Sequence, residues 1–166
     1  MPKTNQSGKQ QKSTAGTGFG SSNSSQKESS GSDLEQAIEK LRGTKVTKTK
    51  LRREIFNSLF DNATENPEVG KWYFFEYDPK YKAQLKQWDE FPLIRLMEIK
   101  GQNLLGANLH YIQQNARLKA INKEEVPTAT LHYYIPKNAD NIFFEIPESD
   151  VALLSQLPVE KFHRNN

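Results

Sequence analysis

The feature that most restricts the fold is the segment Lys-Trp-Tyr-Phe-Phe-Glu-Tyr, which holds five aromatic residues in seven and ends at Tyr77. Aromatic residues favour β-strands, and alternate side chains of a strand point to opposite faces. One face would carry Tyr73, Phe75 and Tyr77. The other would carry Trp72 and Phe74. Because both faces are aromatic, the pattern predicts a strand that is covered on both sides.

Further strands are predicted at residues 93–99, 104–112, 128–135 and 141–146. The first two are separated by only four residues, which is typical of an antiparallel hairpin. Gly106 lies inside the second of them and indicates a bulge or a close approach of another chain segment. Short strands joined by tight turns predict an α+β chain with a small, partly open antiparallel β-barrel of the SH3-like kind.

Two short amphipathic helices are predicted before the strands. The first begins with a Ser-Asp-Leu-Glu capping box at Ser32 and ends near Gly43. The second covers about residues 49–60. Their apolar stripes recur every three or four positions and consist of Leu34, Ile38 and Leu41 in the first helix and Leu51, Ile55 and Leu59 in the second. A later helix at residues 113–122 would direct Ala116, Leu118 and Ile121 inward.

The composition changes near residue 32. Residues 1–32 hold nine Ser and five of the nine Gly residues of the chain, with almost no apolar side chains. Such a segment cannot bury enough apolar surface to offset an ordering cost of about 1–2 kcal/mol per residue. The sequence therefore predicts a disordered Ser/Gly/Lys arm at residues 1–31, a basic helical segment at 32–66 and a β-barrel domain at 67–166.

The net positive charge of the chain comes from its N-terminal part. The whole chain has 23 basic and 20 acidic residues, and residues 33–166 contain 19 of each. The body is therefore neutral, which argues against a uniformly basic nucleic-acid-binding domain.

One local basic run remains, because residues 40–53 carry seven Lys and Arg residues and no acidic residue. Such a run can neutralise phosphates without regard to base sequence, or pair with an acidic protein surface. Both interpretations stand. The predicted contact residues for a polyanion or a protein partner are Lys45, Lys48, Lys50, Arg52 and Arg53.

The sequence offers little support for catalysis. It has no cysteine, no phosphate-binding glycine loop and no His-Glu-x-x-His motif. His110 and His132 could meet on neighbouring strands, but two imidazoles do not complete a metal site, and we expect hydrogen-bonded histidines instead. The adjacent Asp89 and Glu90 are expected in a solvated loop. We predict no catalytic, cofactor-binding or metal-binding residues, no enzyme activity and no small-molecule substrate.

Asn108 and His110 form a separate polar pair on one strand face. They constitute either a polar contact site or an internal hydrogen-bonded pair. No apolar run approaches the ~20 residues of a membrane span, so no membrane partner is expected.

Three blocks within residues 70–112 carry a family resemblance: Trp-Tyr-Phe-Phe-Glu-Tyr-Asp-Pro-Lys, then Trp-Asp-Glu-Phe-Pro-Leu-Ile, then Leu-Gly-Ala-Asn-Leu-His-Tyr. They resemble a family of small virion or assembly proteins of T4-like tailed bacteriophages. The resemblance implies a non-enzymatic structural or assembly component that docks to other virion proteins, in the virion and, during assembly, in the host cytoplasm. The alternative is a nucleic-acid-binding accessory protein that uses the arm and residues 40–53, with DNA as its partner.

Overall fold

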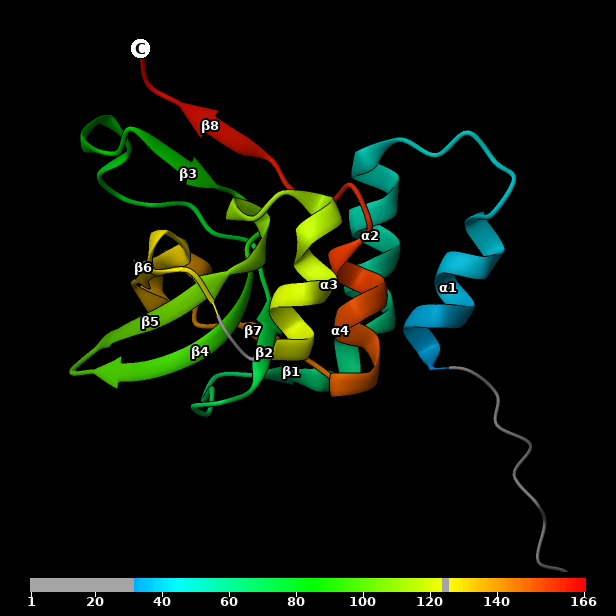
Figure 1. Cartoon of the computed structure of the whole chain (residues 1–166), viewed down its shortest axis with the longest axis horizontal. Helices are drawn as coiled ribbons and strands as arrows, with labels where there is room; N and C mark the ends of the chain where they lie inside the picture. Colours follow the sequence, from blue (N-terminus) through cyan, green and yellow to red (C-terminus); the bar gives the residue numbers. More distant parts are fainter. Residues whose placement is uncertain (1–31, 124–125) are drawn as a thin grey trace, which may run out of the picture. The chain divides into compact units, whose positions relative to one another are not determined.

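The computed structural model describes residues 32–123 and 126–166. The predicted disordered arm at residues 1–31 lies outside the described residues. Figure 1 shows helices packed beside an antiparallel sheet. The α-helices are α1 (Asp33–Leu41), α2 (Lys48–Ser58), α3 (Gln114–Lys123) and α4 (Glu148–Ser155). The strands are β1 (Ala63–Thr64), β2 (Trp72–Phe74), β3 (Gln87–Asp89), β4 (Leu93–Lys100), β5 (Asn103–Asn108), β6 (Leu131–Tyr134), β7 (Phe143–Ile146) and β8 (Phe162–Arg164). Short 3-10 turns are η1 (Phe60–Asn62), η2 (Lys82–Gln84), η3 (Leu109–Tyr111), η4 (Thr128–Thr130) and η5 (Pro136–Ala139).

The six-stranded sheet has the order β1-β7-β2-β4-β5-β6, and its neighbouring strands are antiparallel. The predicted hairpin is confirmed as β4 and β5, but its second strand ends at Asn108 instead of residue 112 and is followed by η3. The α+β class is also confirmed, but the predicted SH3-like barrel does not form, because the edge strands β1 and β6 do not pair with each other. Two strand pairings differ from the simple succession of hairpins that the predicted barrel would have. Strand β7 enters between β1 and β2, and β3 leaves the sheet to form a separate ribbon with β8.

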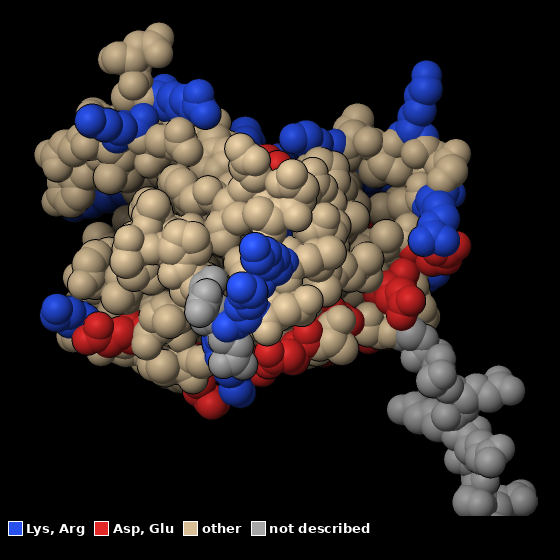
Figure 2. All heavy atoms as spheres, viewed as in Figure 1, with Lys and Arg blue, Asp and Glu red and all other residues tan. Residues whose placement is uncertain are grey.

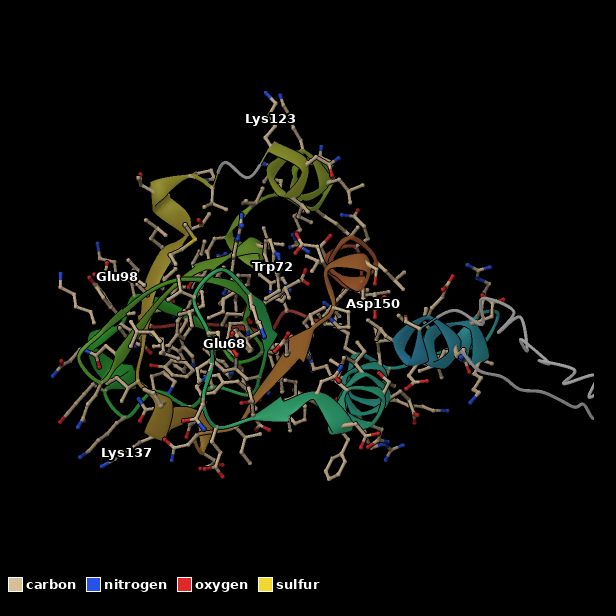
Figure 3. All side chains as sticks on the ribbon, turned by 90° about the horizontal axis from the view of Figure 1, so that it is seen from below. Glu68, Trp72, Glu98, Lys123, Lys137 and Asp150 are labelled. Carbon is tan, nitrogen blue, oxygen red and sulfur yellow. The ribbon has the colours of Figure 1, made fainter. Side chains whose placement is uncertain are left out.

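The sheet is covered on both faces, as the aromatic strand predicted. Trp72 and Phe74 belong to a core cluster with residues of α1, α2 and α4. Tyr73, Phe75 and Tyr77 belong to a second cluster with residues of β4, β6 and β7. Figure 3 shows Trp72 inside the molecule, near α3 and α4, whereas Lys123 and Lys137 project outward. The predicted aromatic strand is shorter than expected, because β2 ends at Phe74, but the alternation continues to Tyr77 and distributes the five rings between two cores.

The first two helices form where their apolar stripes predicted them, and the predicted cap at Ser32 is confirmed. The Ser32 hydroxyl accepts a hydrogen bond from the backbone N–H of Glu35 at 3.1 Å. The Thr47 hydroxyl accepts one from the backbone N–H of Lys50 at 3.2 Å. These contacts satisfy donors that the first turn of a helix leaves free. Gly43 has a φ of +80°, which explains why the chain leaves α1 there.

The predicted inward face of α3 is confirmed for Ile121, which is half-buried and packs against the first core, but it is wrong for the other two residues. Ala116 and Leu118 are exposed, and Arg117 lies buried between them. The Arg117 guanidinium donates to the carbonyl of Ser155 at 2.8 Å and to that of Ile112 at 3.0 Å. Ser155 is the last residue of α4, where a helix leaves its carbonyl groups without internal partners. Arg117 therefore occupies an inward position of α3 because its guanidinium satisfies carbonyl groups that an apolar side chain would leave unpaired.

Among residues 32–123 and 126–166, no helix combines the length and the apolar character required to cross a membrane.

Candidate nucleic-acid interface

The basic run lies on the outer surface of α2 and on the connection before it. Leu51 is half-buried and Ile55 buried on the inner side of the helix, against the first core. The outward positions leave four cationic side chains exposed to solvent. We refer to these four as the basic surface: Lys45, Lys48, Lys50 and Arg53. Within the described part of the chain, none of the four forms an ion pair.

The start of α2 concentrates this positive charge. The first turn of the helix contains Lys48 and Lys50 and no acidic residue. A helix N-terminus carries a partial positive charge, so a cation placed there costs roughly 0.3–1 kcal/mol. The same arrangement attracts anions, because the dipole and the side chains have the same sign. The basic surface is therefore electrostatically unfavourable for the isolated protein and favourable for a polyanion.

Arg52, a predicted contact residue, has a structural role instead. It is buried, and its Nε donates to the carbonyl of Val159 at 2.6 Å. Its Nη2 donates to the carbonyl of Glu160 at 3.3 Å, and the guanidinium lies 4.5 Å from the centre of the Phe91 ring. These contacts attach α2 to the segment before β8. Arg52 is therefore buried below the basic surface, and two of its donor groups are directed to backbone carbonyls.

Positive charge continues beyond α2 along one edge of the molecule. Figure 2 shows Lys and Arg atoms at intervals along the upper edge, from the connection between α1 and α2 to the β3–β8 ribbon. In and beside the ribbon, Lys86 and Arg164 are exposed. The edge thus combines a compact basic surface at α2 with scattered cations at the ribbon.

The predicted polar pair of Asn108 and His110 lies in the interior. Their exposed fractions are 0% and 4%, so neither offers a contact surface to a partner. Both bind Asp89 Oδ2, through Asn108 Nδ2 at 3.2 Å and His110 Nδ1 at 2.6 Å. Asp89 Oδ1 accepts the backbone N–H groups of Phe91 at 3.2 Å and Lys161 at 3.1 Å. One carboxylate therefore joins β3, the end of β5, η3 and the segment before β8.

The expectation of a solvated loop at Asp89 and Glu90 is wrong for Asp89, which is only 3% exposed and belongs to β3. Burial by itself raises the pKa of the Asp89 carboxyl. The hydrogen bond and charge of His110, with the hydrogen bonds from Lys161 and Asn108, outweigh burial and lower the pKa below its usual value. Glu90 points elsewhere and pairs with Lys161 and His163. The two carboxylates thus do not converge as acid–base catalysis requires.

The two histidines that were predicted on neighbouring strands have different surroundings: His132 lies in β6, whereas His110 lies in η3. His110 faces Asp89, whereas the His132 ring stacks on Tyr111 with ring centres 4.1 Å apart. Burial lowers the pKa of His132, against the opposing effect of a hydrogen bond to the Ala129 carbonyl. Among the described residues, no group of three or more His, Cys, Asp and Glu side chains is placed to hold a metal ion.

An aromatic cleft was not predicted from the sequence. It has a volume of about 400 Å³ and lies between residues 77–89 and β6. Its only local signal in the sequence was the enrichment of Lys and aromatic residues between Pro79 and Pro92. Its second wall comes from β6, more than one element away in the chain, so the sequence alone did not join the two.

Residues 35–132 match the family model described as the phage T4 terminal DNA protecting protein. The match covers more than half of the chain and includes the basic surface, Asp89, Asn108 and His110. It confirms the resemblance to proteins of T4-like bacteriophages. No curated protein and no solved structure gives a significant match to the chain.

Proposed function

This chain belongs to the family of the phage T4 terminal DNA protecting protein, and we propose that it binds the ends of linear phage DNA and shields them without catalysing a reaction. The observation that carries the proposal is the basic surface. Its four exposed cations have no ion-pair partner in the described part of the chain, and they lie within the matched segment.

Binding through phosphates suits such a role. Lys and Arg side chains that neutralise phosphates release counterions from the duplex, and the resulting affinity does not depend on base sequence. The N-terminal end of α2 adds the positive end of the helix dipole to Lys48 and Lys50. A protein bound over the last base pairs blocks exonucleases by occupying their site of entry, which requires no catalytic group.

Docking to other virion proteins is the second candidate. Residues 33–166 contain equal numbers of acidic and basic residues, and beyond the basic surface the cations along the same edge are scattered. An acidic protein surface of limited size would complement it as well as a phosphate backbone does. The first candidate function places the protein at phage DNA ends in the infected cell, and the second places it in the particle.

The test compares the wild type with a variant that neutralises the basic surface: Lys45→Gln, Lys48→Gln, Lys50→Gln and Arg53→Gln. Gln is nearly as good a helix former as Lys and Arg, and the apolar stripe of α2 is unchanged, so the variant should fold. A matched control removes four exposed cations elsewhere, through Lys100→Gln, Lys119→Gln, Lys123→Gln and Lys137→Gln.

The wild type should protect a linear duplex from an exonuclease and should bind it more tightly than a closed circle of the same sequence. In the basic-surface variant the slope of log affinity against log salt should flatten by about one unit per lost phosphate contact. The control variant should keep both protection and slope. Equal protection of DNA by the wild type and by the basic-surface variant would refute the proposed contact between the basic surface and DNA. A variant that protects DNA normally but fails to enter particles would favour docking to virion proteins.

A further inference from the structure

The aromatic cleft has the lining of a ligand site. It opens at the left in Figure 2, between the β3–β8 ribbon and β6. Its volume of about 400 Å³ is within the range of small-ligand sites. Six aromatic rings line it: Tyr77, Tyr81, Trp88, Tyr111, Tyr133 and Tyr134.

Two of these rings remain available to a ligand. Trp88 stacks on His163 with ring centres 4.8 Å apart and an interplanar angle of 11°, and Tyr111 stacks on His132. Tyr81 and Tyr133, in contrast, are 56% and 53% exposed and contact no other aromatic ring in the described part of the chain. The exposed rings of these two tyrosines provide stacking surfaces in the cleft that no other ring of the described residues occupies.

The polar lining is suited to a neutral group that both donates and accepts hydrogen bonds. Four amide side chains line the cleft, and none bonds another described residue: Gln84, Gln87, Asn103 and Asn138. Asp89 is the only acidic residue among the described lining residues, and its two oxygens already accept four hydrogen bonds. The amides are therefore the free polar groups of the cleft.

A cation lies beside this aromatic lining. Lys80 also lines the cleft, and its Nζ lies 5.6 Å from the centre of the Tyr81 ring. Within residues 32–123 and 126–166 it pairs with no carboxylate. A ligand that combines a flat ring, amide-like edges and an attached anion would use each of these groups.

We propose that the cleft holds an unpaired nucleotide at the end of a DNA strand, with Tyr81 and Tyr133 as stacking surfaces and Lys80 at its phosphate. The inference rests on the proposed function and deepens it. Bases inside a duplex are stacked on their neighbours, whereas a frayed or overhanging terminus presents free base faces. Aromatic stacking accepts any base, because every base has a π-face. The cleft thus distinguishes an end from internal duplex, which phosphate contacts alone do not.

The test measures the affinity of the full chain for a blunt duplex, for the same duplex with a short single-stranded thymidine overhang, and for that overhang built from abasic sites. Overhangs of both polarities are used. The variants are Tyr81→Leu with Tyr133→Leu, which removes the rings, and Tyr81→Phe with Tyr133→Phe, which keeps them. Phe60→Leu is a control, because Phe60 is an exposed aromatic residue that does not line the cleft.

The wild type should bind the thymidine overhang of at least one polarity about 5- to 100-fold more tightly than the blunt or abasic duplex, since each stacked base contributes about that factor. The Leu variant should lose this preference and keep its affinity for the blunt duplex. The Phe variant and Phe60→Leu should retain it. Equal wild-type affinity for thymidine and abasic overhangs, or an unchanged preference in the Leu variant, would overturn the inference and leave the proposed function intact. Failure to bind any of these DNAs would overturn both.

Discussion

Replacing Asp89 by Asn alters only one oxygen of a buried side chain, yet we expect a large loss of stability. Asp89 Oδ1 accepts two backbone N–H groups, and Oδ2 accepts Asn108 Nδ2 and His110 Nδ1. All four partners are donors. An asparagine has one carbonyl oxygen and one NH2 group, so in either orientation its NH2 group faces two donors.

The magnitude follows from these counts. Each buried donor left without an acceptor costs about 1–3 kcal/mol, so two cost about 2–6 kcal/mol. A change of tautomer at His110 would let its Nδ1 accept from the new NH2 group, which reduces the loss to about 1–3 kcal/mol. A single domain has only about 5–15 kcal/mol of stability, so either loss is measurable by urea denaturation.

Asp78→Asn is the matched control, because Asp78 is exposed and, among the residues that the structure describes, its carboxylate pairs only with Lys82. An exposed pair of this kind contributes about 0–1 kcal/mol. If Asp89→Asn lowered the free energy of unfolding by no more than Asp78→Asn does, the account of Asp89 as a saturated acceptor would be wrong.

Acid provides a second readout of the same group. The lowered pKa of Asp89 means that the unfolded chain binds its proton more readily than the folded chain. The contribution of Asp89 is therefore fully present above the unfolded pKa of about 3.9 and is lost as the pH falls through the folded value. Below about pH 4 the free energy of unfolding of the wild type should fall more steeply than that of Asp89→Asn.

Three further substitutions probe other parts of the fold through the same denaturation measurement. Arg52→Gln should cost about 1–3 kcal/mol, because two carbonyls lose their donor, whereas Arg53→Gln on the exposed side should change stability by less than about 0.5 kcal/mol. Gly106→Ala should cost about 1–3 kcal/mol, since a Cβ there would lie 2.6 Å from Ile94 Cδ1 and 3.0 Å from its Cβ; an unchanged midpoint would show that the two strands can separate at no cost. Phe75→Ala should lower the free energy of unfolding by about 3–5 kcal/mol, because Phe75 is buried among the rings of Tyr77, Tyr134 and Phe143. A loss below about 1 kcal/mol would contradict this burial.

Local patterns in the sequence predicted much of the architecture. The alternation of Trp72 to Tyr77 identified a strand with two covered faces, because side-chain direction in a strand depends only on position. Gly106 indicated a bulge or a close approach; in the structure the register of β4 shifts next to its partner Leu96, and the side chain of Ile94 covers Gly106. The cap at Ser32 depends on residues within one turn and was predicted from local sequence, whereas the cap at Thr47 was not predicted.

Features that depend on distant partners were not accessible in this way. Asp89 resembles a surface residue until its donors are known, and three of these come from Asn108, His110 and Lys161. Arg52 follows the charge pattern of its neighbours, but its donors reach carbonyls at the other end of the chain. In both cases a polar side chain is buried because remote backbone or side-chain groups satisfy it, which no local period reveals.

The position of β7 in the sheet has a consequence for how the chain reaches its native state. Phe144 pairs with Ala63 of β1 on one side and with Phe74 of β2 on the other. Both partners are synthesised long before β7, so a large loop must close before these pairs contribute, and sheets of this kind fold slowly. Until then one edge of β2 has unpaired backbone groups, next to aromatic side chains that are buried in the native protein. Such an edge can pair with a strand of another chain. Fragments that stop before residue 143 should therefore aggregate, even though they contain most of both cores.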